Sequence, residues 1–299
     1  MNYQGIEFFN RYTGQIEQEA IYGEKWLRWA YESRLGALAR WGLIKRGLFS
    51  RWYGWRMDRP QSRAKIMPFI DTYGLDPSAF AEPVSSFRTF NEFFVRRLKP
   101  SLRPIDSAAN AIVFPADGRH LGFENISAVD AIYAKGQRFD LRTLLASDEL
   151  ARRYDSGSLV ISRLCPVDYH RYHWCVPGVA SEARLVPGSL ESVNPIALSK
   201  HISIFGSNRR MITQIDSDNA GRVLSLEVGA TCVGSIIQTF CPGERVLKGD
   251  QKGMFLFGGS CVITVFEPGK VRLAPDLVEQ TRAGRELYAH MGDRLGVAQ

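Results

Sequence analysis

Apolar residues follow two different patterns along the chain, with a change near residue 105. In residues 17–54 they recur near a helical period, and residues 87–98 carry a second apolar helical face. From about residue 111 onward they form short runs separated by Gly and Pro, which is typical of β-strands. We therefore expect an α+β fold, with a helical N-terminal section (residues 1–105) followed by a mostly antiparallel β core (residues 106–299).

The β core is predicted from its short runs. They lie at residues 111–114, 131–134, 158–163, 173–176, 183–185, 211–215, 223–228, 231–240, 253–257 and 261–266. One clear helix, residues 141–154, interrupts them. The runs do not alternate with helices at the roughly 30-residue spacing of βαβ units, so a doubly wound parallel sheet is not expected.

Composition narrows the class of protein. The five cysteines are odd in number and include no Cys-x-x-Cys pair, which argues against a zinc site or a disulfide framework and favours a reducing compartment. The first twelve residues lack the apolar core of a signal peptide. No segment reaches the roughly 18 apolar residues of a membrane span. We expect a protein that is soluble or lies on a membrane surface.

The net charge of +7 is concentrated in residues 25–59, where nine Lys and Arg face two acidic residues. Five of the six tryptophans lie in the same segment. Trp interleaved with Arg and Lys on an amphipathic helix suits the interface of an anionic membrane. The alternatives are a basic helix that packs its tryptophans on its own core, or nucleic acid. No nucleic-acid-binding motif is present, so we expect a membrane contact and no nucleic acid.

Residues 255–266 place Gly258-Gly259-Ser260 between two apolar runs of β type. Glycine tolerates backbone angles that a Cβ forbids, so the pair allows a sharp turn. The simplest interpretation is a hairpin in which the glycines make the turn and the Ser260 side chain hydrogen-bonds to the turn backbone. The other interpretation is a nucleophile, which requires a base near Ser260.

Three further residues can supply acid–base chemistry. Asp117 follows a short strand in a Pro/Gly turn, and His170 and His173 lie three residues apart. A structural role remains open for each, whereas the i, i+4 histidines of a common metal motif are missing. With Ser260 they form an Asp–His–Ser set, in which an acid orients an imidazole that deprotonates a hydroxyl. The serine lacks the Gly-x-Ser-x-Gly context of a nucleophile elbow, so an ordinary hydrolase fits poorly.

At these positions the chain resembles the pyruvoyl-dependent phosphatidylserine decarboxylases. Gly258-Gly259-Ser260 matches the self-cleavage site of that family, preceded by a similar lead-in over residues 248–255. Five further blocks occur in the family's order: Phe90-Asn-Glu-Phe-Phe-x-Arg-x-Leu98 with Arg103-Pro104, Pro115-Ala-Asp-Gly118, Asp168-Tyr-His-Arg-x-His173, Pro187-Gly-x-Leu-x-Ser-Val-Asn194 and Val228-Gly-Ala-x-x-Val-Gly-Ser-Ile236. Two departures are Cys261, where Ser or Thr is usual, and Gln251, where Glu is common.

The resemblance implies a proenzyme that cuts itself between Gly259 and Ser260. Asp117 would orient His173, His173 would take the proton of Ser260, and the Ser260 Oγ would attack the carbonyl of Gly259. β-Elimination of the resulting ester and release of ammonia would convert Ser260 into a pyruvoyl group. The products would be a beta chain, residues 1–259, and an alpha chain, residues 260–299, held together as a heterodimer.

The pyruvoyl group would then form a Schiff base with the amine of phosphatidylserine and accept electrons as CO2 leaves, giving phosphatidylethanolamine without a metal. His170 would position the carboxylate or deliver the final proton, and Ser192 matches a residue near the family's substrate pocket. The resemblance also implies a peripheral protein on the cytoplasmic face of a bacterial cell membrane. The alternatives are a lipid hydrolase with an intact chain and a membrane-binding homologue that never matures.

Overall fold

The computed structural model describes residues 6–19, 29, 33, 47–129, 139–198, 201–230, 236–258 and 260–299. Most of the helical segment expected at residues 17–54 lies outside the described residues, as do the candidate strand at 131–134 and Gly259. The candidate strand at 231–240 is described only from Ile236 onward.

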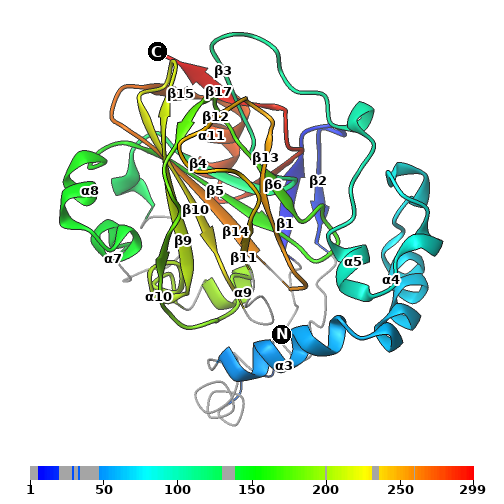
Figure 1. Ribbon diagram of the computed structural model, residues 1–299. Helices are drawn as coiled ribbons and strands as arrows, with labels where there is room; N and C mark the ends of the chain where they lie inside the picture. The colour runs from blue at the N-terminus through cyan, green and yellow to red at the C-terminus, as the bar shows by residue number, and fades with distance from the viewer. Residues whose placement is uncertain are drawn as a thin grey trace.

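An 11-stranded sheet forms the centre of the molecule (Figure 1). Its order is β12-β7-β9-β10-β14-β5-β4-β16-β1-β2, and β8 also pairs with β9. The bounds are β1 Glu7–Asn10, β2 Gln15–Gln18, β4 Gly118–Phe123, β5 Ser158–Leu164, β7 Gly178–Ala180, β8 Arg184–Val186, β9 Arg210–Ser217, β10 Arg222–Val228, β12 Arg245–Val246, β14 Ser260–Phe266 and β16 Glu286–Ala289. Among these strand pairs only β1 with β16 is parallel. The expected mostly antiparallel core is therefore confirmed.

The middle strands of this sheet are buried on both faces. Along β5, Leu159 and Ile161 join one apolar cluster and Val160 joins another, as the alternation of a strand requires. The first cluster is covered by α7 (Leu141–Leu145), α9 (Pro195–Leu198) and α10 (Ile204–Ser207). The second is covered by α11 (Pro275–Arg282) and a small sheet of β15 (Val271–Leu273), β17 (Arg294–Ala298) and β3 (Ala111–Val113). Strand β14, which pairs with β5, is likewise buried along its whole length.

A second small sheet joins β11 (Ile236–Gln238), β13 (Gln251–Phe255) and β6 (Arg171–His173). In its antiparallel register, Gln251 pairs with His173 and Met254 pairs with Arg171. The two-histidine motif therefore runs beside the segment that leads to Ser260.

Residues 47–102 form a helical unit that packs over this segment, with Phe257 in its apolar cluster. It contains α3 (Gly47–Met57), α4 (Ile66–Tyr73) and α5 (Phe90–Phe94), with short 3-10 helices at Pro60–Lys65, Pro77–Ala79, Val84–Ser86 and Pro100–Leu102. Gly74, with φ of 62°, ends α4, and the Thr89 side chain caps α5 by accepting the Glu92 N–H. Figure 1 shows α3 along the bottom of the molecule and α4 and α5 on its right, on the opposite side from α7 and α8.

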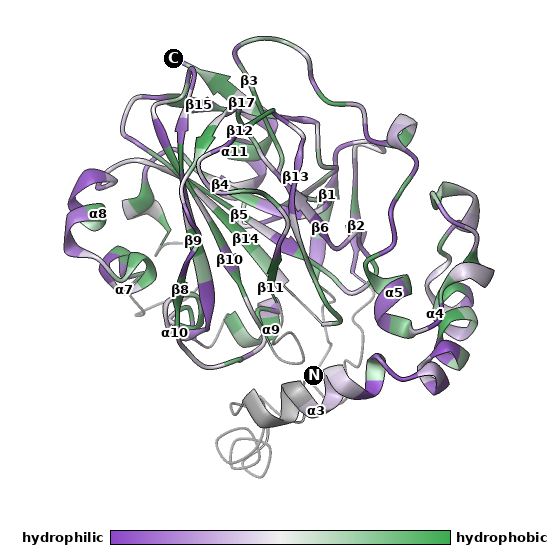
Figure 2. Cartoon of the chain, viewed as in Figure 1, coloured by the Kyte–Doolittle hydropathy of each residue, from purple (hydrophilic) through white to green (hydrophobic). Residues whose placement is uncertain are grey.

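Two expectations about local structure were wrong. The N-terminal section does not begin as a helix, because β1 and β2 form a hairpin in which β1 adds to β16 of the main sheet. The helix expected at residues 141–154 is two helices, α7 and α8 (Asp148–Arg153). Ala146 takes a left-handed φ of 47° between them, and the Ser147 side chain caps α8. Figure 2 shows that α8 is largely hydrophilic, as suits a helix at the edge of the fold.

Candidate active site

Ser260 is the first residue of β14, where it pairs with Leu164 of β5. The chain reaches it from β13 through a short turn in which Gly258 has φ of 138°, a conformation that residues with a Cβ rarely adopt. The hydroxyl is fully buried, and its Oγ has no hydrogen-bond partner among the described residues. A buried hydroxyl without a partner is costly in a structural role, so the position is a candidate for chemistry.

His170 lies next to the turn that precedes Ser260. Its backbone carbonyl accepts the N–H of Phe255, and its Nδ1 lies 3.0 Å from the carbonyl oxygen of Asp168. Burial lowers the pKa of His170 to about 3, although the backbone of Asp168 and the backbone of Gly258 oppose that change. The ring is therefore neutral near pH 7. Its Nε2 has no partner within hydrogen-bond distance in the described part of the chain.

His173 is the last residue of β6, where it pairs with Gln251 of β13. Its backbone N–H donates to the carbonyl of Pro115 at 2.7 Å, and its ring Nδ1 lies 3.0 Å from the carbonyl oxygen of Gly249. Burial lowers the pKa of His173 to about 4, against the opposing effects of the Gly249 backbone and the Asp117 charge. A backbone carbonyl accepts only from Nδ1–H, so Nε2 is the basic nitrogen. That nitrogen is also buried without a partner among the described residues.

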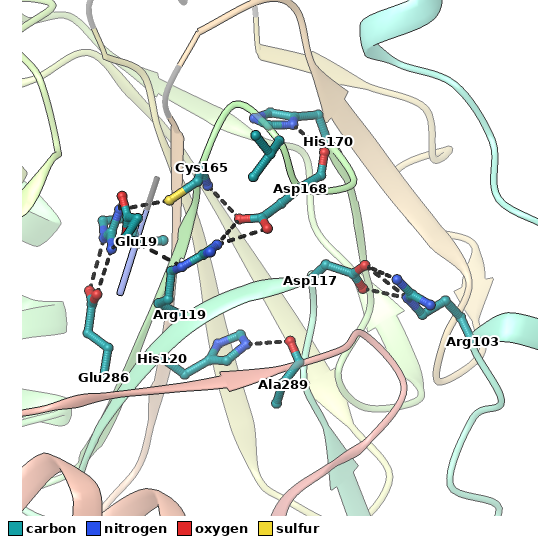
Figure 3. Close-up of polar contacts among 12 residues, drawn as sticks. Glu19, Arg103, Asp117, Arg119, His120, Cys165, Asp168, His170, Glu286 and Ala289 are labelled. Carbon is teal, nitrogen blue, oxygen red and sulfur yellow. Dashed lines mark hydrogen bonds and ion pairs between the residues drawn. The ribbon is translucent and has the colours of Figure 1, made fainter. Parts of the chain in front are cut away.

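Asp117 immediately precedes β4 and is bound by Arg103 (Figure 3). The Arg103 Nε donates to both carboxylate oxygens at 2.9 Å, and the Met291 N–H donates to Oδ1 at 2.9 Å. Between these described residues there is no hydrogen bond from His173 to the carboxylate. The structure thus brings Asp117 close enough to influence the pKa of His173 but does not form the expected Asp–His contact.

The turn that carries His170 is fixed by a buried ionic network. Arg119 Nη1 donates to both oxygens of Asp168, at 2.8 and 2.6 Å, and the Cys165 N–H donates to the same carboxylate at 2.7 Å. Figure 3 shows Arg119 reaching Asp168 on one side and Glu19 on the other. Sequence reasoning placed Asp168 in a motif but missed its partner Arg119, which follows the Pro115–Gly118 block with no local signal of pairing.

Glu19 joins this network to the N-terminal segment. Its carboxylate forms ion pairs with Arg163 and Arg119, and Arg163 also pairs with Glu286. Burial alone would raise the pKa of Glu19, but the charge and hydrogen bonds of Arg163 lower it to about 2. The carboxylate therefore stays ionised at any physiological pH, and the ionic network stays intact.

A cavity of about 350 Å³ adjoins these residues. Its lining includes Arg96, Arg103, Asp117, Arg119 and Asp168, but not Ser260, His170 or His173. Ser192 does not line it either; its Oγ accepts the Asn194 N–H at 3.2 Å in the loop before α9. The structure therefore groups Asp117 with the cavity and leaves Ser192 away from it.

The described helices give two further facts about partners. None is long and apolar enough to span a membrane.

Helix α3 exposes Trp52 and Trp55, and the guanidinium groups of Arg56 and Arg59 lie 5.1 and 4.1 Å from the centres of those rings. Within the described ranges, no group of three or more His, Cys, Asp or Glu side chains is placed to hold a metal ion.

Comparison with known proteins gives a consistent result. Residues 90–296 match the sequence model of the family described as phosphatidylserine decarboxylase. The chain is 41% identical, over 98% of its length, to the phosphatidylserine decarboxylase proenzyme of Desulfitobacterium hafniense strain Y51, covering 98% of that protein. It is 41% identical, over 97% of its length, to the proenzyme of Clostridium beijerinckii, covering 98% of that relative. With the proenzyme of Clostridium perfringens strain SM101 the identity is 40%, over 97% of the chain and 99% of the relative.

Proposed function

The chain belongs to the phosphatidylserine decarboxylase family, and on that premise we propose that it is a self-cleaving proenzyme that converts phosphatidylserine to phosphatidylethanolamine and CO2. The observation that carries the proposal is Ser260, a buried hydroxyl without a partner among the described residues, which follows the Gly258-Gly259 pair in the sequence. The same position fits a pyruvoyl group made from that serine, because a small planar group replaces a side chain that makes no hydrogen bond there.

In the proposed maturation, His173 takes the proton of the Ser260 hydroxyl and Asp117 stabilises the resulting imidazolium through its charge. The Ser260 Oγ bonds to the carbonyl carbon of Gly259, the peptide C–N bond breaks, and the proton passes to the freed amine. Loss of the Ser260 Cα proton then breaks the Cβ–O ester bond and leaves a carboxylate on Gly259. Rearrangement to an imine and hydrolysis by water release ammonia and leave the pyruvoyl group.

Three features of the site support this sequence. The pKa values of about 3 for His170 and about 4 for His173 keep both rings neutral near pH 7, so that a ring nitrogen of each is free to accept a proton. The Ser260 Oγ and both Nε2 atoms are shielded from solvent, which favours attack by the hydroxyl over hydrolysis by water. The positive φ of Gly258 leaves the turn with a backbone that only glycine adopts readily.

The two products would remain together because the short chain is woven into the fold. Residues 260–299 contribute β14 to the centre of the main sheet, β16 beside β4, and β15 and β17 to the small sheet with β3. Cleavage in the turn before β14 leaves these pairings unbroken. We therefore propose a beta chain of residues 1–259 and an alpha chain of residues 260–299 that form a non-covalent heterodimer.

When formed, the pyruvoyl group would supply a carbonyl that takes the substrate amine and an adjacent carbonyl that accepts the electrons released with CO2. The residues around it would control protons and access. His170, which lies beside Gly258, would position the substrate carboxylate or deliver the proton that replaces CO2. Ser192 is a weaker candidate for the substrate pocket; its Oγ accepts the N–H of Asn194 in the loop before α9.

We further propose that the N-terminal section, residues 1–105, holds the catalytic domain, residues 106–299, on an anionic membrane. The exposed Trp52 and Trp55, each beside an arginine, suit the level of the lipid headgroups. A phospholipid could then present its headgroup while its acyl chains stay in the bilayer. The expected location is the cytoplasmic face of a bacterial cell membrane.

An intact-mass spectrum of the purified, active protein under denaturing conditions tests the proposal. We expect two chains that meet at Gly259 and Ser260, with pyruvoyl at the start of the short one, and decarboxylation of phosphatidylserine vesicles. A single full-length chain in an active preparation would instead favour the lipid hydrolase, and a fluorophosphonate probe should then label it. A single, inactive chain that binds vesicles would favour the membrane-binding homologue.

A further inference from the structure

We propose that Asn91 is a positioning residue for self-cleavage, whose side chain fixes the backbone of the segment that leads to the scissile bond. The proposal rests on the proposed function, since it concerns the same cleavage. Asn91 lies in α5 and is almost fully buried. It is far from Ser260 in the sequence, and no motif argument assigned it a role.

The amide of Asn91 joins two parts of the chain. Its Oδ1 accepts the backbone N–H of Phe257 at 3.1 Å, two residues before Gly259. Its Nδ2 donates to Asp58 Oδ1 at 2.7 Å and, more weakly, to the Gly54 carbonyl at 3.4 Å. A carboxylate only accepts hydrogen bonds, so Asp58 sets the orientation of the amide and turns its oxygen toward the cleavage segment.

The side chain of Phe257 is held by the same helical unit. Its ring centre lies 5.2 Å from that of Phe90, 4.9 Å from that of Phe94 and 5.6 Å from that of Tyr53. Phe257 belongs to the apolar cluster of the N-terminal section rather than to the clusters of the main sheet. Its backbone and its ring are therefore both fixed by α3 and α5.

This arrangement anchors the turn at both ends. On one side Phe257 is bound by Asn91, and on the other Ser260 is paired in β14. The two residues between them are glycines, which restrain the backbone least. Attack by Oγ on a carbonyl requires the two atoms to be held about 3–3.5 Å apart, and a displacement of about 1 Å can cost roughly 100-fold in rate. The anchor at Phe257 therefore restrains the backbone on the N-terminal side of the scissile bond.

One of the aromatic side chains that hold Phe257 also contacts His170. The ring of Phe94 contacts both Phe257 and His170, with its centre 4.0 Å from that of the imidazole. Helix α5 thus holds the segment before the scissile bond and a candidate catalytic ring through neighbouring side chains. This is the geometric reason to assign Asn91 to the reaction rather than to the stability of the helical unit alone.

The test is the rate of self-cleavage of Asn91→Ala in the full-length chain made by cell-free translation. The two products are separated from the uncut chain under denaturing conditions over time. We expect cleavage to slow by about 10- to 100-fold. The wild-type chain measured in parallel separates the two hypotheses: a wild type that never cuts would contradict the proposed function, whatever the variant does.

Ser62→Ala is the matched control. The Ser62 Oγ accepts the Phe90 N–H at 2.8 Å and donates to the carbonyls of Met57 and Arg59, so this change removes buried hydrogen bonds from the same helical unit but none to the segment before Ser260. Thermal unfolding of both variants measures how much stability each has lost relative to the wild type. We expect Ser62→Ala to cut at nearly the wild-type rate at a similar loss of stability. Equal slowing of the two variants at equal stability would overturn the proposal.

Two further readouts identify the step and the contact. In Asn91→Asp the new carboxylate faces the carboxylate of Asp58, so cleavage should be slower. Adding Asp58→Asn to this variant restores a hydrogen-bond donor between the two side chains, and the rate should return to within about threefold of wild type. Hydroxylamine cleaves an oxygen ester but not the unreacted peptide bond. We expect it not to rescue Asn91→Ala, because the attack itself is slow. Rescue by hydroxylamine, or no recovery in the swapped pair, would refute a positioning role in the attack.

Discussion

The carboxylate of Asp117 is bound to Arg103, whose Nε lies 2.9 Å from both of its oxygens, and not to the ring of His173. Asp117 is 2% exposed and Arg103 is 17% exposed, so the pair is largely shielded from water. The charge of Asp117 nevertheless opposes the fall in the pKa of His173. In the uncut chain Asp117 therefore acts on His173 electrostatically, while its hydrogen bonds go to Arg103 and Met291.

Asp117→Asn is expected to slow self-cleavage by at least about tenfold, because the imidazolium formed on His173 loses the negative charge that stabilises it. The amide oxygen can still accept the Met291 N–H, so the turn before β4 should keep its shape. A time course of cell-free translated chain under denaturing conditions gives the rate.

Arg103→Gln is the contrasting variant. It removes the cation that neutralises Asp117 and leaves the carboxylate free to act on His173, so we expect cleavage at least as fast as in the wild type. Stability should fall by about 2 kcal/mol, less than for a fully buried pair because Arg103 is partly exposed. Equal slowing in both variants would show that the ion pair, rather than the charge on Asp117, is what matters.

His173→Ala should give a single uncut chain, since the base for the Ser260 hydroxyl is missing. His170→Ala should cut but lose decarboxylation of phosphatidylserine, measured as CO2 release after the two chains have formed. Failure of His170→Ala to cut would reverse this division of roles, and the position of His170 beside Gly258 makes that the sharpest comparison. Circular dichroism of both purified variants controls for folding.

The sequence predicted the long apolar strands of the core and the helix at residues 87–98, but it missed β4, β7, β12 and the strands after residue 270. Runs such as residues 158–163 and 261–266 are long and apolar because β5 and β14 are buried on both faces. The hairpin of β1 and β2 has no such pattern, because its stability comes from pairing with β16, which lies far along the chain. The break at Ala146 was also missed, since the Ser147 cap that begins α8 outweighs a continuous helical pattern.

The site shows a similar limit. Motifs pointed to Asp117, His170, His173 and Ser260 as candidates, because each lies in a short stretch with a distinctive composition. Which groups bind each other depends on contacts between distant segments. The pairing of Asp117 with Arg103 and of Asn91 with Phe257 follows from the packing of the helical section on the core, which no local pattern encodes.

Lower pH should destabilise the fold through its buried histidines. The pKa values are about 3 for His120 and His170 and about 4 for His173, all lowered first of all by burial, from 6.5. Their contribution is complete above the unfolded value and is lost as pH falls from about 6.5 toward the folded values. We expect a loss on the order of 2 kcal/mol for each such histidine between pH 7 and pH 5, measured by urea unfolding.

Two variants test which histidines cause this dependence of the unfolding free energy on pH. His120→Gln should reduce the change in unfolding free energy between pH 7 and pH 5, because one buried imidazole has been removed. His201→Gln, at an exposed position, should leave the slope unchanged. The rate of self-cleavage should stay nearly constant over the same range, since His173 remains neutral until about pH 4. A cleavage rate that halves near pH 6.5 would contradict a base buried in this way.

Trp52 and Trp55 should contribute to membrane binding but not to folding, because they are 49% and 52% exposed on α3. Replacing both by Ala is expected to weaken binding to vesicles of mixed phosphatidylcholine and phosphatidylserine by at least about tenfold, measured by sedimentation. The melting temperature and the rate of self-cleavage should be unchanged. Leu185→Ala, at an apolar position of similar exposure on β8, should bind like the wild type. If the two tryptophans can be removed without loss of vesicle binding, α3 is not the membrane contact, and another part of the N-terminal section must supply it.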